Sequence, residues 1–188
     1  MRKNSYKLIS FCVITLFFIQ CNSNNKFAVS KEKVGKLTPK TTIDQLEHIF
    51  KNDSIVKNLS EGSTGDNYFQ DDDEYLVYEK GGKHLLTIVP KEQLDSTSTI
   101  KSIQIFDKRF KTKSAISLGA SFEEVNLNNT ITNVETSLSS ATLFIDDLNV
   151  TLTLDKEDLG LKNESSQKIN LEQIPGLAKV KSFIVWFN

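Results

Sequence analysis

Two histidines are the first candidates for chemistry in this chain of 188 residues, because histidine exchanges protons and binds metals near neutral pH. His48 and His84 are far apart in the sequence, so only the fold could join them into an acid-base pair or a metal site. The spaced motifs of zinc proteases, serine hydrolases and P-loop nucleotidases do not occur. We therefore predict no catalytic residue, no metal site and no cofactor, and expect that the protein is not an enzyme.

The densest group of charges is acidic and consists of Asp71, Asp72, Asp73 and Glu74. Calcium prefers clustered carboxylate oxygens, so a calcium site is one interpretation. The spacing does not match a calcium loop of the Asp-x-Asp-x-Asp-Gly type, and adjacent side chains on a strand point to alternating sides. The simpler interpretation is a solvated flank of a hairpin.

Aromatic residues flank this acidic run, which suggests a surface for a protein partner. Tyr68 and Phe69 precede it and Tyr75 follows it. Aromatic side chains supply much of the energy at interfaces, and a charged rim steers the encounter. We predict a partner-binding patch made of these three aromatics with the acidic residues 71–73. In the alternative, the tyrosines face the core and the acids keep an edge strand soluble.

The N-terminus has the pattern of an export signal that ends at a cysteine. Three basic residues precede an apolar stretch, residues 8–19, that is too short for a transmembrane helix. Residues 18–21 are similar to a bacterial lipobox, although Gln20 departs from the small residue usual before the cysteine. We predict that residues 1–20 are a lipoprotein signal peptide and that Cys21 carries the lipid. The alternative is an ordinary secretory signal peptide that is cleaved at a site near Cys21.

Composition restricts the partners of the exported part. The chain has two cysteines, and Cys12 lies in the signal, which leaves Cys21 as the one cysteine of the exported part. An ordinary hydrophobic core and not disulfides must therefore stabilise the fold. Three of the 23 basic residues also lie in the signal, which leaves 20 basic against 24 acidic residues, a formal charge of −4. This charge argues against nucleic acid and anionic headgroups as partners. We expect contact with the membrane through the lipid anchor only.

Two short sequences are similar to the site at which exported Bacteroidetes proteins are O-glycosylated. They are Asp53-Ser54-Ile55 and Asp95-Ser96-Thr97. Three-residue patterns often occur by accident, so the modification of Ser54 or Ser96 stays open.

Two pairs of segments match each other at nearly the same offset, which predicts an internal repeat. Residues 42–46 match residues 121–125 at an offset of 79, and both are capping boxes that begin a helix. Residues 100–106 match residues 180–186 at an offset of 80, and both have the composition of strands. The first helix has an apolar stripe, whereas the second is expected to last barely two turns.

Further strands are expected between the matched ends. In the first copy they are residues 75–78 and 85–89, joined at Gly81-Gly82, a hairpin turn signal. In the second copy they are residues 141–145 and 150–154. Residues 183–187 are apolar on both faces, which predicts a strand in the sheet interior or at an interface.

The predicted fold class is α+β, with two tandem helix-plus-antiparallel-strand units that form one sheet and place both helices on one face. The polar residues 21–33 are expected to be a flexible tether. Residues 34–107 then form the first unit and residues 108–188 the second.

Residues 35–46, 116–122 and 174–183 resemble uncharacterised envelope lipoproteins of the Bacteroidetes type, with an architecture similar to the tandem β-lactamase-inhibitor fold. The resemblance implies a domain that binds other proteins and has no catalytic motif. Residues 22–25 lack the acidic tag of surface-exported lipoproteins, which favours the periplasmic side.

We therefore expect a non-catalytic binding or assembly module that engages an envelope protein. The alternative is a periplasmic protein that binds a small ligand in a cleft between the units. A hydrolase with dispersed catalytic residues is the third hypothesis.

Overall fold

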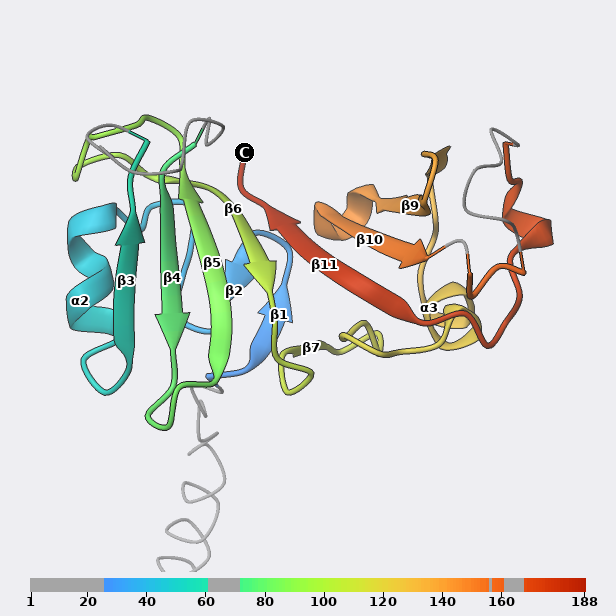
Figure 1. The fold of residues 1–188 in the computed structure, drawn as a ribbon, viewed down its shortest axis with the longest axis horizontal. Helices are drawn as coiled ribbons and strands as arrows, with labels where there is room; N and C mark the ends of the chain where they lie inside the picture. Colours follow the sequence, from blue (N-terminus) through green and yellow to red (C-terminus); the bar gives the residue numbers. More distant parts are fainter. Residues whose placement is uncertain (1–25, 61–71, 156, 161–167) are drawn as a thin grey trace, which may run out of the picture.

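The computed structural model describes residues 26–60, 72–155, 157–160 and 168–188. Within these residues, eleven strands form two sheets, which Figure 1 shows with β11 crossing the centre of the molecule. The signal peptide predicted at residues 1–20 lies outside the described residues.

The larger sheet has eight strands in the order β3-β4-β5-β6-β11-β10-β9-β8, and every neighbouring pair is antiparallel. Its strands are β3 (Ser54–Asn58), β4 (Glu74–Tyr78), β5 (His84–Pro90), β6 (Ile100–Ile105), β8 (Asn133–Thr136), β9 (Ser140–Ile145), β10 (Val150–Asp155) and β11 (Val180–Trp186). The strands predicted between residues 75 and 154, and the one at the C-terminus, are confirmed.

The smaller sheet has three strands, β1 (Ala28–Ser30), β2 (Lys33–Val34) and β7 (Lys111–Thr112). β1 is antiparallel to β2 and parallel to β7. Val29 and Val34 of this sheet are buried. Residues 28–34 are therefore part of the folded body, whereas a flexible tether was expected over residues 21–33.

The predicted capping boxes mark the start of α3 and of the 3-10 turn that leads into α2, but both α-helices are short. A 3-10 turn (Ile43–Gln45) leads into α2 (Leu46–Ile49), and α3 spans Phe122–Asn128. The Ser121 hydroxyl accepts a hydrogen bond from the Glu124 N–H at 3.3 Å, and the Glu124 carboxylate accepts one from the Ser121 N–H at 3.0 Å. Two further 3-10 turns are Asp146–Leu148 and Leu171–Gln173.

Alternation of apolar and polar residues determines which side of the eight-stranded sheet becomes the core. In β4, β9 and β10 every second residue is buried, as expected for strands with one covered face. The central strands add further fully buried residues, among them Ile103 of β6 and Phe183 of β11. This buried face packs with residues from α2, α3 and the three-stranded sheet into one hydrophobic cluster.

The two strands matched at the 80-residue offset lie side by side at the centre of the sheet. β6 and β11 pair antiparallel, with Ile105 opposite Phe183 and Ile103 opposite Val185. The strands β3 to β5 extend the sheet from β6, and β10 to β8 extend it from β11.

The predicted fold class is wrong. The sequence predicted an α+β protein, similar to the β-lactamase-inhibitor fold, with two helix-plus-strand units and helices on one face. The described chain is mostly β, with eleven strands and α-helices of only four and seven residues. α2 ends at Ile49 and α3 at Asn128, so neither is long enough to form a helical layer.

Candidate functional site

Four of the residues predicted to have a function lie outside the described residues: Cys21, Tyr68, Phe69 and Asp71. The other three members of the predicted partner patch, Asp72, Asp73 and Tyr75, are described. Their burial decides whether this part of the patch can contact a partner.

Asp73 is a buried structural residue. One of its carboxylate oxygens accepts hydrogen bonds from the Ser60 N–H and hydroxyl, both at 2.8 Å, and the other accepts one from the Leu94 N–H at 2.6 Å. Burial alone would raise the pKa of Asp73, but the hydrogen bonds from Leu94 and Ser60 outweigh it and hold the pKa below its ordinary value. Asp73 thus connects the start of β4 to two distant loops.

Tyr75 is also buried, between Lys57 of β3 and Ile88 of β5. Burial raises the pKa of its hydroxyl, and the negative charge of Asp73 raises it further. Asp72 is half-exposed and forms an ion pair with Lys101 at 3.1 Å. The prediction that Asp73 and Tyr75 contact a partner is therefore wrong, and Asp72 alone of the three lies at the surface.

The two histidines occupy different parts of the fold. His48 is exposed on α2, whereas His84 of β5 stacks between Tyr78 and Phe106, with ring centroids 4.7 and 4.0 Å apart. The Nε2 atom of His84 lies 3.1 Å from the Leu86 carbonyl oxygen. In the described part of the chain, no group of three or more His, Cys, Asp or Glu residues could hold a metal ion.

Both serines of the predicted glycosylation sequences are exposed. Ser54 is the first residue of β3, and Ser96 lies in the turn before β6. The acids that precede them have structural contacts, because Asp53 binds Lys26 and Asp95 accepts hydrogen bonds from Thr97. Modification at either serine stays a prediction.

A row of uncharged side chains crosses the whole eight-stranded sheet on the face opposite the core, here called the open face. The strand registers place these residues opposite one another from β3 to β8: Val56, Leu76, Thr87, Gln104, Ile184, Thr151, Phe144 and Asn133. Half of them are apolar, and none carries a charge. Val56 and Asn133 at its two ends are exposed, Thr87 is buried, and the other five are partly exposed. Continuous uncharged surface of this kind often marks a site of interaction.

Aromatic side chains border this row on both sides. The Tyr78–His84–Phe106 stack lies at one side, and its Phe106 is 41% exposed. Trp186 lies at the other side, is 37% exposed, and donates a hydrogen bond from its indole N–H to the Thr151 hydroxyl at 3.1 Å. The two-sided apolar sequence of residues 183–187 was the signal for Trp186, since it indicated an interior strand or an interface.

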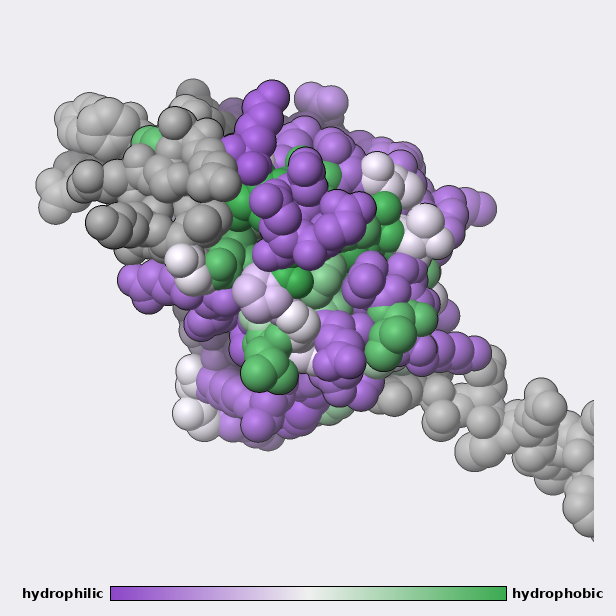
Figure 2. All heavy atoms as spheres, turned by 90° about the vertical axis from the view of Figure 1, so that its right-hand side faces the viewer, coloured by the Kyte–Doolittle hydropathy of each residue, from purple (hydrophilic) through white to green (hydrophobic). Residues whose placement is uncertain are grey.

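The end of the molecule formed by α3 and β9 is a weaker candidate for a partner surface. Its most exposed apolar side chains include Leu127 of α3 and Leu177, at 77% and 79%. Figure 2 shows this end as mainly hydrophilic, with hydrophobic patches interrupted by hydrophilic residues. Single exposed leucines of this kind are normal on protein surfaces.

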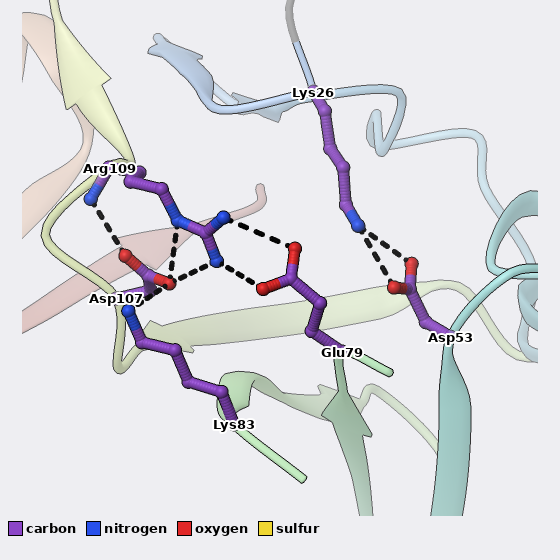
Figure 3. Close-up of polar contacts among 6 residues, drawn as sticks. All are labelled: Lys26, Asp53, Glu79, Lys83, Asp107 and Arg109. Atoms are coloured by element: carbon purple, nitrogen blue, oxygen red, sulfur yellow. Dashed lines mark hydrogen bonds and ion pairs between the residues drawn. The ribbon is translucent and has the colours of Figure 1, made fainter. Parts of the chain in front are cut away.

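A cavity of about 240 Å³ lies between the two sheets and the end of α2. Its apolar wall includes Val34 of β2, Leu86 of β5, and Phe50, which follows α2. Its polar lining includes Lys26 and Asp53. The Lys26 ammonium contacts both Asp53 oxygens at 2.9 Å (Figure 3). This ion pair joins the start of β1 to the start of β3 at the edge of the cavity.

A second charge network lies beside this pair in Figure 3 and is centred on Asp107. The Asp107 carboxylate is fully buried, accepts hydrogen bonds from the Arg109 N–H and Nε, each at 2.9 Å, and pairs with Lys83 at 2.9 Å. Burial would raise the pKa of Asp107, but the hydrogen bonds from Arg109 and Lys83 lower it far below its ordinary value.

Arg109 extends this network to the three-stranded sheet. Its guanidinium donates to both carboxylate oxygens of Glu79, at 3.2 and 2.7 Å, and its Cζ lies 4.3 Å from the ring centroid of Phe27. Phe27 in turn packs edge-on against Phe110 at 5.0 Å. Each charge here has a partner, so we interpret the network as structural.

Within the part of the chain that the structure describes, the α-helices lack the length and apolar composition that a membrane span requires.

Comparisons with known proteins give information on the fold alone. No protein-family model matches the chain, and no curated protein matches it. The chain is similar to the crystal structure of the uncharacterized protein YfeY from Escherichia coli, with a TM-score of 0.52 and 13% sequence identity. The match covers 86% of this chain and 99% of YfeY, so nearly the whole of that fold has a counterpart here.

Proposed function

We propose that this chain is a non-catalytic lipoprotein of the bacterial cell envelope that binds another envelope protein through the open face of its eight-stranded sheet. Cys21 anchors it to the membrane, on the periplasmic side. The uncharged row from Val56 to Asn133, bordered by Phe106 and Trp186, is the observation that carries the proposal.

The composition of the open face supports a protein partner. The centres of protein interfaces are depleted in charged residues and enriched in aromatic ones. Tryptophan and tyrosine are also the residues at which truncation most often weakens binding. The face offers Trp186 on one side of the row, and on the other side Phe106, which is exposed, with Tyr78, which is partly exposed, in the same stack.

Replacing Cys21 with serine is expected to release the protein from membranes, because the serine hydroxyl does not take the thioether-linked lipid of a bacterial lipoprotein. The measurement is fractionation of cells that express the parent or the variant, with immunodetection in the membrane and soluble fractions. Cys12→Ser is the matched control, since it changes the other cysteine within the signal. Equal membrane recovery of parent and Cys21→Ser would refute the anchor.

Photocrosslinking tests the open face directly. We expect p-benzoylphenylalanine at Val56 or at Phe106 to capture the same partner in native membranes, because both positions are exposed on this face. Leu177 is the control position, as it is exposed but lies outside the sheet. Val56→Asp should weaken capture from position 106 by placing a charge in the apolar row. Capture from position 177 alone, or equal capture from all three positions, would contradict the proposal.

The cavity between the sheets favours a second candidate function, the binding of a small ligand. Its apolar wall and its polar Lys26–Asp53 edge are the combination found in ligand sites. Its volume of about 240 Å³, however, lies below the roughly 300–1,000 Å³ typical of such pockets. The ion pair also occupies the polar groups that would orient a ligand. We therefore favour the open face.

A further inference from the structure

A hollow on the open face has the features of a site for a positive charge. It has a volume of about 300 Å³ and lies between Phe144 of β9 and Trp186 of β11, with Asp146 at its border. Lysine and arginine are absent from its lining. The hollow thus combines two aromatic rings with one carboxylate.

Trp186 is held in the orientation that such a site needs. Its indole N–H donates to the Thr151 hydroxyl of the neighbouring strand β10 at 3.1 Å, and its backbone N–H donates to the Asn149 carbonyl at 2.8 Å. The indole is therefore fixed across β10 while more than a third of the residue stays exposed. Of the aromatic side chains, tryptophan attracts a cation to its ring most strongly.

Asp146 supplies a negative charge that no described cation neutralises. It is exposed in the 3-10 turn between β9 and β10, and no lysine or arginine of the described chain forms an ion pair with it. Two other acids of the second half, Asp155 and Asp158, both pair with Lys181. A carboxylate beside an aromatic ring complements a lysine or arginine side chain in charge and in shape.

We propose that the hollow bounded by Phe144, Trp186 and Asp146 receives a lysine or arginine side chain of the protein that binds the open face. This inference rests on the function proposed above and specifies the chemistry of the partner. The cation lies against the indole and pairs with the Asp146 carboxylate. The uncharged row beside it contacts the apolar surroundings of that basic residue.

The chain offers its own reporter, because Trp186 is its one tryptophan. The experiment titrates the purified exported domain with N-acetylarginine amide and follows the tryptophan fluorescence at constant ionic strength. N-acetylcitrulline amide is the matched neutral probe, since its side chain has nearly the same shape without the charge. We expect a saturable change with the arginine probe and at most a small, non-saturating change with the citrulline probe.

Neighbouring acids supply the matched variants. Asp146→Asn should raise the half-saturating arginine concentration severalfold, whereas Asp147→Asn should leave it unchanged, because Asp147 borders a different hollow. The two variants change the net charge equally, and their melting curves report whether each is folded. If both variants had the same effect, the binding would be explained by the net charge of the protein and not by the hollow, and the inference would be overturned.

Two other results would also overturn it. Equal responses to the arginine and citrulline probes would show that the hollow does not recognise charge. A saturable response to N-acetylglucosamine in place of arginine would assign the hollow to a glycan. The crosslinks from positions 56 and 106 do not depend on Trp186, so their persistence in Asp146→Asn membranes would leave the proposed function standing even where this inference fails.

Discussion

Phe183→Ala is expected to lower the melting temperature by roughly 6–20 °C, since truncating a buried aromatic costs about 3–5 kcal/mol and each kcal/mol shifts the midpoint by about 2–4 °C in a protein of this size. Phe183 is fully buried at the centre of the sheet, opposite Ile105 of β6 and Leu152 of β10. Its removal leaves a cavity where the two halves of the sheet meet.

Calorimetry or circular dichroism on the exported domain provides the measurement. Ile184→Ala is the matched control, because Ile184 follows Phe183 in the same strand but lies on the open face and is only partly buried. We expect less than half the loss for this control. Similar melting temperatures for Phe183→Ala and the parent would mean that β11 does not form part of the core.

Asp107→Asn is expected to reduce the free energy of unfolding by about 2–4 kcal/mol at neutral pH. This loss is smaller than that for a fully buried ion pair, because Lys83 and Arg109, the cationic partners of Asp107, are half-exposed. The uncharged amide cannot hold both Arg109 and Lys83. Arg109 would also lose part of the support for its contact with Phe27. Denaturant unfolding at several pH values measures the loss.

The pH dependence has a definite sign. Because the folded protein holds the pKa of Asp107 far below its ordinary value, this carboxylate stabilises the fold at neutral pH. Its contribution decreases once the pH falls below about 4, where the unfolded chain begins to bind the proton. The difference between parent and Asp107→Asn should therefore shrink as the pH falls. A difference that stays constant from pH 7 to pH 3 would contradict the role of the charge. Asp72→Asn, which removes an exposed ion pair, should cost at most about 1 kcal/mol.

Local signals in the sequence predicted most of the eight-stranded sheet. Short runs of strand-forming residues identified β4, β9 and β10, and two glycines marked the turn between β4 and β5, where Gly81 and Gly82 have φ of +102° and +85°. The capping box at Ser121 marked the start of α3. These features depend on residues close in sequence, so the sequence alone was sufficient for them.

Features that depend on distant residues were not predictable in the same way. β1 pairs with β7, about 80 residues later, and neither strand is long enough to show a pattern. Asp72 and Asp73 are adjacent residues of the same type, so the sequence does not distinguish them. In the fold, Asp73 is buried and bonded to Ser60 and Leu94, whereas Asp72 lies at the surface. The open face was missed for the same reason, because its central row combines one residue from each of eight strands.

The early start of the folded body limits how far it can stand from a membrane. Lys26 is already fixed to Asp53, and β1 begins at Ala28. With Cys21 acylated, five residue steps separate the lipid from Lys26, and a fully extended chain spans at most about 3.3–3.6 Å per residue, roughly 18 Å in total. That reach is shorter than the roughly 30 Å hydrocarbon core of the bilayer beneath it. With that anchor, the near side of the folded body would stay within roughly 18 Å of the headgroups.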